Sequence, residues 1–241
     1  MLEAINLSKK YAGEKALSGL NLKVNAGEIF CLLGANGAGK TTTINLFMGF
    51  IKPSSGQVLV DGKNVVDYPS ETKNHIAYIP ENLHLYGNLT GIENLKFFTG
   101  LGGNNIDSLQ AEALLREAGL QADAHAKRVV KYSKGMRQKV GIAIARAKEA
   151  QNLLLDEPTS GLDPQASSDF ANLLENLRES NVAILMATHD LFRAKESGTH
   201  IGIMREGTLV HTMKSDEITL KDLEELYLET MKTENNAEVD R

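Results

Sequence analysis

The sequence predicts an α/β protein with a mostly parallel sheet, interrupted by an α-helical insertion. Short apolar runs separated by turn residues fill residues 1–80, as they do in strands. From about residue 90 to 150, the apolar residues follow helical spacing instead. The last third returns to near-continuous apolar runs of strand length, which are typical of parallel strands covered on both faces.

The first expected elements are strands, separated by turn residues such as Asn25-Ala26-Gly27 and Asp61-Gly62. These strands cover residues 2–7, 17–24, 28–33, 57–60 and 75–79.

Helical faces follow in the middle and last parts of the chain. The first places five apolar residues together: Leu109, Ala113, Leu114, Leu115 and Ala118. Between expected strands at 153–155 and 182–187, a second helix places four apolar residues on one face: Phe170, Leu173, Leu174 and Leu177. Segment 215–231 is amphipathic, and the polar tail 233–241 is expected to fray.

Composition limits the class of protein. A chain of 241 residues fits one domain with a smaller lobe, and the net charge of -5 argues against a nucleic-acid binder. The single cysteine, Cys31, excludes an internal disulfide and is expected to be a small buried hydrophobe. No run approaches the roughly 18 apolar residues of a membrane span, and the first eleven residues lack the charged-then-apolar order of a secretory signal. We therefore expect a cytosolic protein, whose membrane spans, if any are needed, come from another chain.

A phosphate-binding loop is the strongest motif. Gly34-Ala35-Asn36-Gly37-Ala38-Gly39-Lys40-Thr41 matches G-x-x-x-x-G-K-[ST], after an apolar strand and before a helix expected near Thr41. Backbone N–H groups and the helix N-terminus would hold phosphate oxygens, Lys40 would reach the β- and γ-phosphates, and Thr41 would ligate Mg²⁺. The alternative is a chance match in a flexible turn. The expected nucleotide-binding residues are Gly34, Asn36, Gly37, Ala38, Gly39, Lys40, Thr41 and Thr42.

An acidic pair supplies the other half of such a site. Asp156 follows an apolar run directly and would hold Mg²⁺, and Glu157 would polarise an attacking water. The alternative is two surface acids that end a strand. Asn152, at the start of this run, is a polar residue in an apolar position, and we expect it only to shift where the strand begins.

Four further segments accompany these motifs: Tyr11, Tyr132-Ser133-Lys134-Gly135-Met136-Arg137-Gln138, Ser160-Gly161-Leu162-Asp163-Pro164 and Thr188-His189-Asp190. They resemble segments of the ATP-binding cassette (ABC) ATPases, in the same order along the chain. The resemblance covers nearly the whole chain. It implies a P-loop (RecA-like) core, an N-terminal antiparallel β subdomain and an inserted α-helical subdomain. It also implies one ATPase domain over 1–215, with the insertion at about 85–150, and a C-terminal segment and tail over 216–241.

The resemblance also implies roles for individual residues. Tyr11 would stack on adenine, and His189 would contact the γ-phosphate and act in catalysis with Glu157 and Lys40. Ser133, Gly135 and Asp163 would face the second subunit of a homodimer that closes on two ATP molecules with Mg²⁺. A polytopic membrane subunit would be a separate chain, and this chain would lie on the inner face of the cell membrane.

Two departures from the family pattern indicate which branch of the ABC ATPases this chain resembles most. Lys134 replaces the first signature glycine, and Glu81 stands where glutamine is more common, as a metal-site residue that would act through water. Both variants resemble ATPases of ABC-2-type exporters, and Pro80-Glu81-Asn82 resembles the metalloenzyme-assembly branch among them. An importer ATPase stays open as the main alternative. Soluble ABC ATPases that act on ribosomes or DNA usually carry two cassettes or long insertions, whereas this chain has one cassette and no basic stripe. A non-ABC phosphate-loop kinase would have no reason to carry segments 132–138 and 160–163.

Overall fold

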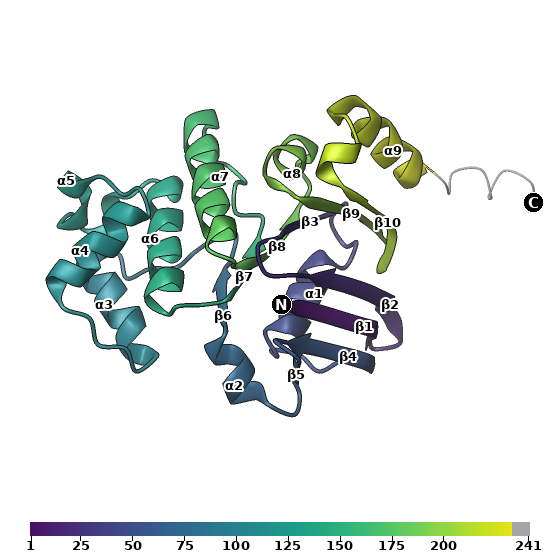
Figure 1. Cartoon of the computed structure of the whole chain (residues 1–241), viewed down its shortest axis with the longest axis horizontal. Helices are drawn as coiled ribbons and strands as arrows, with labels where there is room; N and C mark the ends of the chain where they lie inside the picture. Colours follow the sequence, from purple (N-terminus) through teal and green to yellow (C-terminus); the bar gives the residue numbers. More distant parts are fainter. Residues whose placement is uncertain (233–241) are drawn as a thin grey trace, which may run out of the picture.

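A computed structural model describes residues 1–232, and the predicted polar tail lies outside the described residues. The elements are arranged around two sheets, with a group of helices at one end of the molecule (Figure 1). The strands are β1 Leu2–Tyr11, β2 Glu14–Val24, β3 Ile29–Leu33, β4 Ser55–Val60, β5 Lys63–Asn64, β6 Ile76–Ile79, β7 Asn152–Asp156, β8 Ala183–Thr188, β9 His200–Arg205 and β10 Thr208–Lys214. The α-helices are α1 Lys40–Phe47, α2 Pro69–Asn74, α3 Gly91–Leu101, α4 Ser108–Glu117, α5 Ala122–His125, α6 Lys134–Ala147, α7 Pro164–Glu179, α8 Leu191–Ser197 and α9 Leu220–Lys232. Two short 3₁₀ turns cover Val129–Lys131 and Ser215–Glu217.

The larger sheet has six strands in the order β10-β9-β3-β8-β7-β6. All neighbouring pairs are parallel except β9 with β10, which are antiparallel. Every residue of β3, β7 and β8 is buried, which explains why the middle of each of these strands is an apolar run, with polar residues only at the ends of β7 and β8. Because parallel strands end at the same edge, the residues that follow β3, β6, β7 and β8 are brought together there.

The smaller sheet has four strands in the order β2-β1-β4-β5, and each neighbouring pair is antiparallel. Figure 1 shows this sheet on the opposite side of the molecule from α3–α6. The predicted α/β class is therefore confirmed, with its mostly parallel sheet, N-terminal antiparallel sheet and inserted helices. The boundaries predicted for the subdomains stay a prediction.

Two hydrophobic cores lie on the two faces of the larger sheet. Alternate residues of one strand belong to different cores: Cys31 faces the core that includes α6 and α7, and Leu32 faces the core that includes α1 and the smaller sheet. The four apolar residues predicted to share one face of α7 are all buried. Cys31 is fully buried, as expected.

Three expectations about local structure were wrong. Strands β1 and β2 are longer than predicted. The end of β1 and the start of β2 are rich in polar, exposed residues, so the apolar runs used for the prediction cover only part of each strand. Of the five apolar residues predicted to lie together in and after α4, Leu115 and Ala118 are buried, but Leu109 is 78% exposed and Ala113 is exposed, because the buried face of this helix runs through Ala111 and Leu115. Asn152 does not shift the start of β7.

Asn152 is the first residue of β7, fully buried and paired with Ile76 and Ala183 in register. Its side-chain amide donates to Asp61 Oδ2 at 2.9 Å and accepts from the Met1 ammonium at 2.8 Å. The buried amide is therefore satisfied by charged partners, so a polar residue fits this strand position.

Candidate functional site

The loop between β3 and α1 is shaped by its glycines. Gly39 caps α1 with a φ of 104°, a left-handed conformation that glycine adopts without strain. A Cβ at Gly34 would lie 2.5 Å from the Met204 carbonyl oxygen, so a side chain has no room there. The chain therefore turns tightly from the strand into the helix, and the first N–H groups of α1 have no partners within the helix. Such a helix start attracts anions.

Lys40 is the first residue of α1 and is only 5% exposed. Its ammonium donates to the carbonyl oxygens of Gly34, at 2.5 Å, and Ala35, at 3.2 Å. Burial lowers the pKa of Lys40, whereas the carboxylates of Glu157 and Asp156 oppose that shift. A cation is thus held inside the loop, where it can meet a phosphate group.

Asp156 ends β7, and its carboxylate points toward the start of α1. Its Oδ1 accepts a hydrogen bond of 3.4 Å from Thr41 Oγ1. Burial raises the pKa of Asp156, with a hydrogen bond from Thr41 opposing the shift and the negative charges of Glu157 and Glu81 adding to it. One hydroxyl and one carboxylate oxygen side by side are the kind of ligands that Mg²⁺ prefers, so the residues present fit this ion.

Glu157 has a φ of 46°, unusual for a residue with a side chain, and its N–H donates to the Ala187 carbonyl of β8 at 2.9 Å. Its Oε1 lies 2.9 Å from His189 Nδ1 and 3.8 Å from Lys40 Nζ. Its Oε2 accepts from Thr188 Oγ1 at 3.3 Å. The carboxylate is therefore held between the ends of two neighbouring strands and the phosphate loop.

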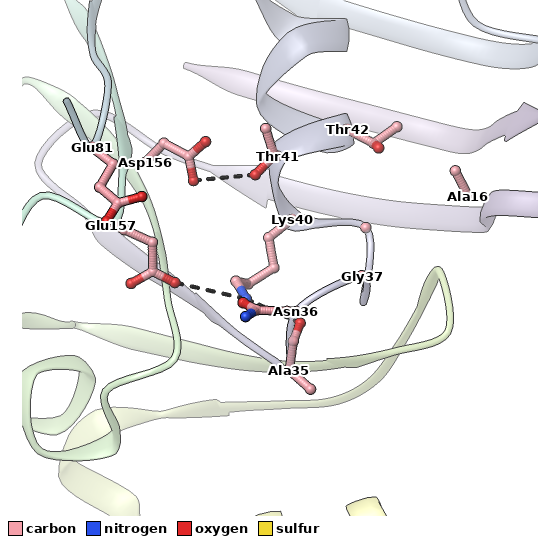
Figure 2. A pocket seen from close by; sticks show the side chains of 11 residues that line it. Ala16, Ala35, Asn36, Gly37, Lys40, Thr41, Thr42, Glu81, Asp156 and Glu157 are labelled. Carbon is pink, nitrogen blue, oxygen red and sulfur yellow. Dashed lines mark hydrogen bonds and ion pairs between the residues drawn. The ribbon is translucent and has the colours of Figure 1, made fainter. Parts of the chain in front are cut away.

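These groups surround a cavity of about 230 Å³. Figure 2 shows Glu81, Asp156 and Glu157 on one side of it, with Lys40 and Thr41 facing them from α1. The lining residues are Ala16, Ala35, Asn36, Gly37, Gly39, Lys40, Thr41, Thr42, Glu81, Asp156 and Glu157. Ala16 of β2 was not predicted from the sequence, because one alanine on a strand carries no recognisable signal.

Several predicted site residues do not line this cavity. Gly34 and Ala38 belong to the loop but do not face the cavity. His189 reaches the site through Glu157, and its side chain is 58% exposed. Tyr11, at the end of β1, is 45% exposed, and the Lys9 ammonium lies 5.0 Å from the centre of its ring. Its contact with adenine stays a prediction.

A second group lies at two helix starts. Ser133 caps α6, and its Oγ accepts from the Met136 N–H at 3.2 Å. Asp163 caps α7 in the same way, accepting from the Ala166 N–H at 2.8 Å. A Cβ at Gly135 would lie 3.2 Å from that of Ala166, so α6 and α7 approach closely here. None of the three predicted residues lines the cavity, so their roles in nucleotide binding depend on another surface.

The cavity can perform phosphoryl chemistry. A buried lysine and a helix start would hold a polyphosphate, Thr41 and Asp156 would hold its metal ion, and Glu157 would accept a proton from water. The fold and this site together define a nucleotide-hydrolysing phosphate-loop protein.

Comparisons with known proteins agree with this class. The family description "ABC transporter" matches residues 17–160. The chain is 37% identical over 244 residues to the bacitracin transport ATP-binding protein BcrA of Bacillus licheniformis, covering 99% of this chain and 77% of that protein. A solved ATP-binding subunit of an ABC transporter superposes with a TM-score of 0.83 at 32% identity, covering 96% of this chain and 100% of the other. An ATP-binding cassette solved as a dimer with ADP and Pi superposes with a TM-score of 0.79 at 25% identity, covering 89% of this chain and 99% of the other.

The chain belongs to the ABC transporter family and is an ATP-binding, ATP-hydrolysing subunit of a transport complex. Among residues 1–232, no helix is long and apolar enough to cross a membrane.

Proposed function

We propose that two copies of this chain close on two ATP molecules and power the export of a substrate through a separate polytopic membrane subunit. The observation that carries the proposal is the cluster of Lys40, Asp156 and Glu157 around one cavity, with Ser133 and Gly135 outside it. One copy supplies a phosphate-binding cavity and, elsewhere, a serine-capped helix start that can meet an anion. A second copy in the opposite orientation would bring that helix start to the cavity.

Within each cavity, Lys40 and the backbone of the loop bind the phosphates. Thr41 and Asp156 would hold Mg²⁺, with Glu81 as a further residue of the metal site, and the ion would supply positive charge beside the phosphate oxygens. Glu157 accepts the proton of the attacking water, and His189 keeps the Glu157 carboxylate in place through their 2.9 Å contact. Tyr11 would stack on the adenine and Asp163 would meet the second copy.

Export, rather than import, is supported by two observations. Glu81 and Lys134 both depart from the commoner family pattern in the direction of the ABC-2-type exporters. The 37% identity to a bacitracin transport ATP-binding protein extends over 99% of the chain. In this arrangement the chain works at the cytoplasmic face of the membrane.

The test is gentle purification of the chain from its native membranes, followed by mass spectrometry of whatever stays bound. We expect a polytopic protein with no ATPase motif of its own and two copies of this chain. Recovery of a solute-binding protein in the same complex would indicate import. A chain found only with ribosomes or nucleic acid would contradict the transport proposal.

A further inference from the structure

The two residues that depart from the family pattern lie next to each other. Glu81 follows β6, and Lys134 begins α6, 53 positions later. Lys134 Nζ lies 3.9 Å from Glu81 Oε1, and both side chains are partly exposed. In the sequence these two residues are far apart and look like independent changes, whereas in the fold they form one ion pair.

Glu81 is also bound by a third segment. Ser160, in the loop before α7, donates to Glu81 Oε1 at 3.0 Å. Gln138 of α6 donates to the main-chain oxygen of Glu81 at 3.5 Å. One residue therefore connects the end of β6, the start of α6 and the loop that follows Glu157.

Close packing holds these segments in place. A Cβ at Gly141 of α6 would lie 2.9 Å from Leu83 Cδ2 and 3.2 Å from Ile79 Cδ1. The absence of a side chain at Gly141 thus lets α6 lie directly on the segment that carries Glu81. The distance between Glu81 and Lys134 is set by this packing and not only by two flexible side chains.

Charge at the start of α6 favours the pairing. The N-terminus of a helix attracts negative charge, yet the first turn of α6 contains Lys134 and Arg137 and no acidic residue. The Glu81 carboxylate supplies, from another segment, the negative charge that this helix start lacks.

Glu81 in turn needs a positive partner. It lines the cavity with Asp156 and Glu157, so three carboxylates face one buried lysine, Lys40, where a polyphosphate would bind. A charged residue at this position, in place of a neutral amide, adds repulsion toward phosphate oxygens. Lys134 offsets that charge.

We propose that Glu81 and Lys134 are a charge-compensating pair. Lys134 keeps the Glu81 carboxylate from weakening nucleotide binding in the cavity of its own chain. Glu81 acts as a positioning residue that connects this cavity to the Ser133–Gly135 helix start, which serves the second copy. This inference rests on the proposed function.

The experiment is a double-mutant cycle on the full chain with Glu81→Gln, Lys134→Gln and the double variant. The probe is the non-hydrolysable analogue adenylyl imidodiphosphate, and its dissociation constant is measured by calorimetry with Mg²⁺ and with EDTA. We expect Lys134→Gln to weaken binding about threefold, the range of a partly exposed pair, and more in EDTA, where the nucleotide carries more negative charge. Adding Glu81→Gln should restore the affinity to near that of wild type.

Lys131→Gln is the matched control. It removes the same charge three residues earlier, and Lys131 forms no ion pair within the described part of the chain. We expect no change in affinity. If Lys134→Gln has no effect, or weakens binding equally in the wild-type and the Glu81→Gln backgrounds, the inference is overturned.

Failure of the proposed function gives a different result. A wild-type chain that does not bind the analogue contradicts the proposed function itself. Urea unfolding of the wild type, the two single variants and the double variant still measures the interaction energy between Glu81 and Lys134. Strictly additive effects on the free energy of unfolding would then overturn the inference as well.

Discussion

Replacing Glu157 by glutamine is the sharpest test of the proposed chemistry. The substitution keeps the size and shape of the side chain and removes only the charge and the ability to accept a proton. The acceptor for Thr188 Oγ1 can be kept by the amide oxygen. The two hydrogen bonds of Lys40 to the carbonyls of Gly34 and Ala35 do not involve Glu157, so they remain when the 3.8 Å ion pair with Glu157 is lost. The cavity should therefore keep its form.

The magnitude follows from the role of the carboxylate. A positioned general base contributes about 10²- to 10⁴-fold to a rate. Because Glu157 is also held in place by His189 and Thr188, we expect at least the middle of this range, a fall in kcat of about 10³-fold. That fall corresponds to about 4 kcal/mol in the activation barrier. Affinity for ATP should stay within about threefold of wild type, since Lys40 keeps the hydrogen bonds to Gly34 and Ala35 that place it in the loop.

The assay is steady-state phosphate release, with ATP binding and the dimer fraction measured on the same samples. Glu149→Gln is a matched control, because Glu149 is an exposed glutamate that also has a positive φ, 54°, but does not line the cavity. The control should hydrolyse ATP at the wild-type rate. Turnover by Glu157→Gln within about threefold of wild type would refute the assignment of Glu157 as the base.

Three other outcomes are expected. Lys40→Ala should weaken ATP binding at least about tenfold, because a buried cation is lost from the phosphate loop, and an unchanged dissociation constant would contradict its role. Asn152→Leu should lower the free energy of unfolding by about 2 kcal/mol or more in urea denaturation, because hydrogen bonds to the charged Asp61 and Met1 groups are lost; a change below about 0.5 kcal/mol would contradict this interpretation. Cys31 should not react with a thiol reagent at pH 8 in the native protein and should react in urea, because burial raises the pKa of its thiol; rapid native reaction would show that this strand opens readily.

The phosphate loop could be predicted because its chemistry is local. Eight consecutive residues, from Gly34 to Thr41, contain the turn, the cation and the hydroxyl, and the preceding strand is buried on both faces. Asp156 and Glu157 could be predicted for the same reason, since they follow another strand of that kind.

The remaining features depend on partners that are distant in sequence. Ala16 lines the cavity only because β2 passes beside the loop, and a Cβ at Gly39 would lie 2.7 Å from its carbonyl oxygen. Asn152 fits a buried strand because Asp61 and the Met1 ammonium, both distant in sequence, hydrogen-bond its amide. Leu109 faces solvent because α4 packs through other residues, and an apolar spacing does not state which face has a neighbour.

The two cores on opposite faces of the larger sheet also affect how this protein can diverge. Within β7, Leu153 and Leu155 belong to the core that includes α6 and α7, whereas Leu154 belongs to the core that includes α1. Neighbouring codons therefore experience separate packing constraints. Substitutions at Leu154 therefore act on the packing beneath α1, and substitutions at Leu153 or Leu155 act on the packing beneath α6 and α7.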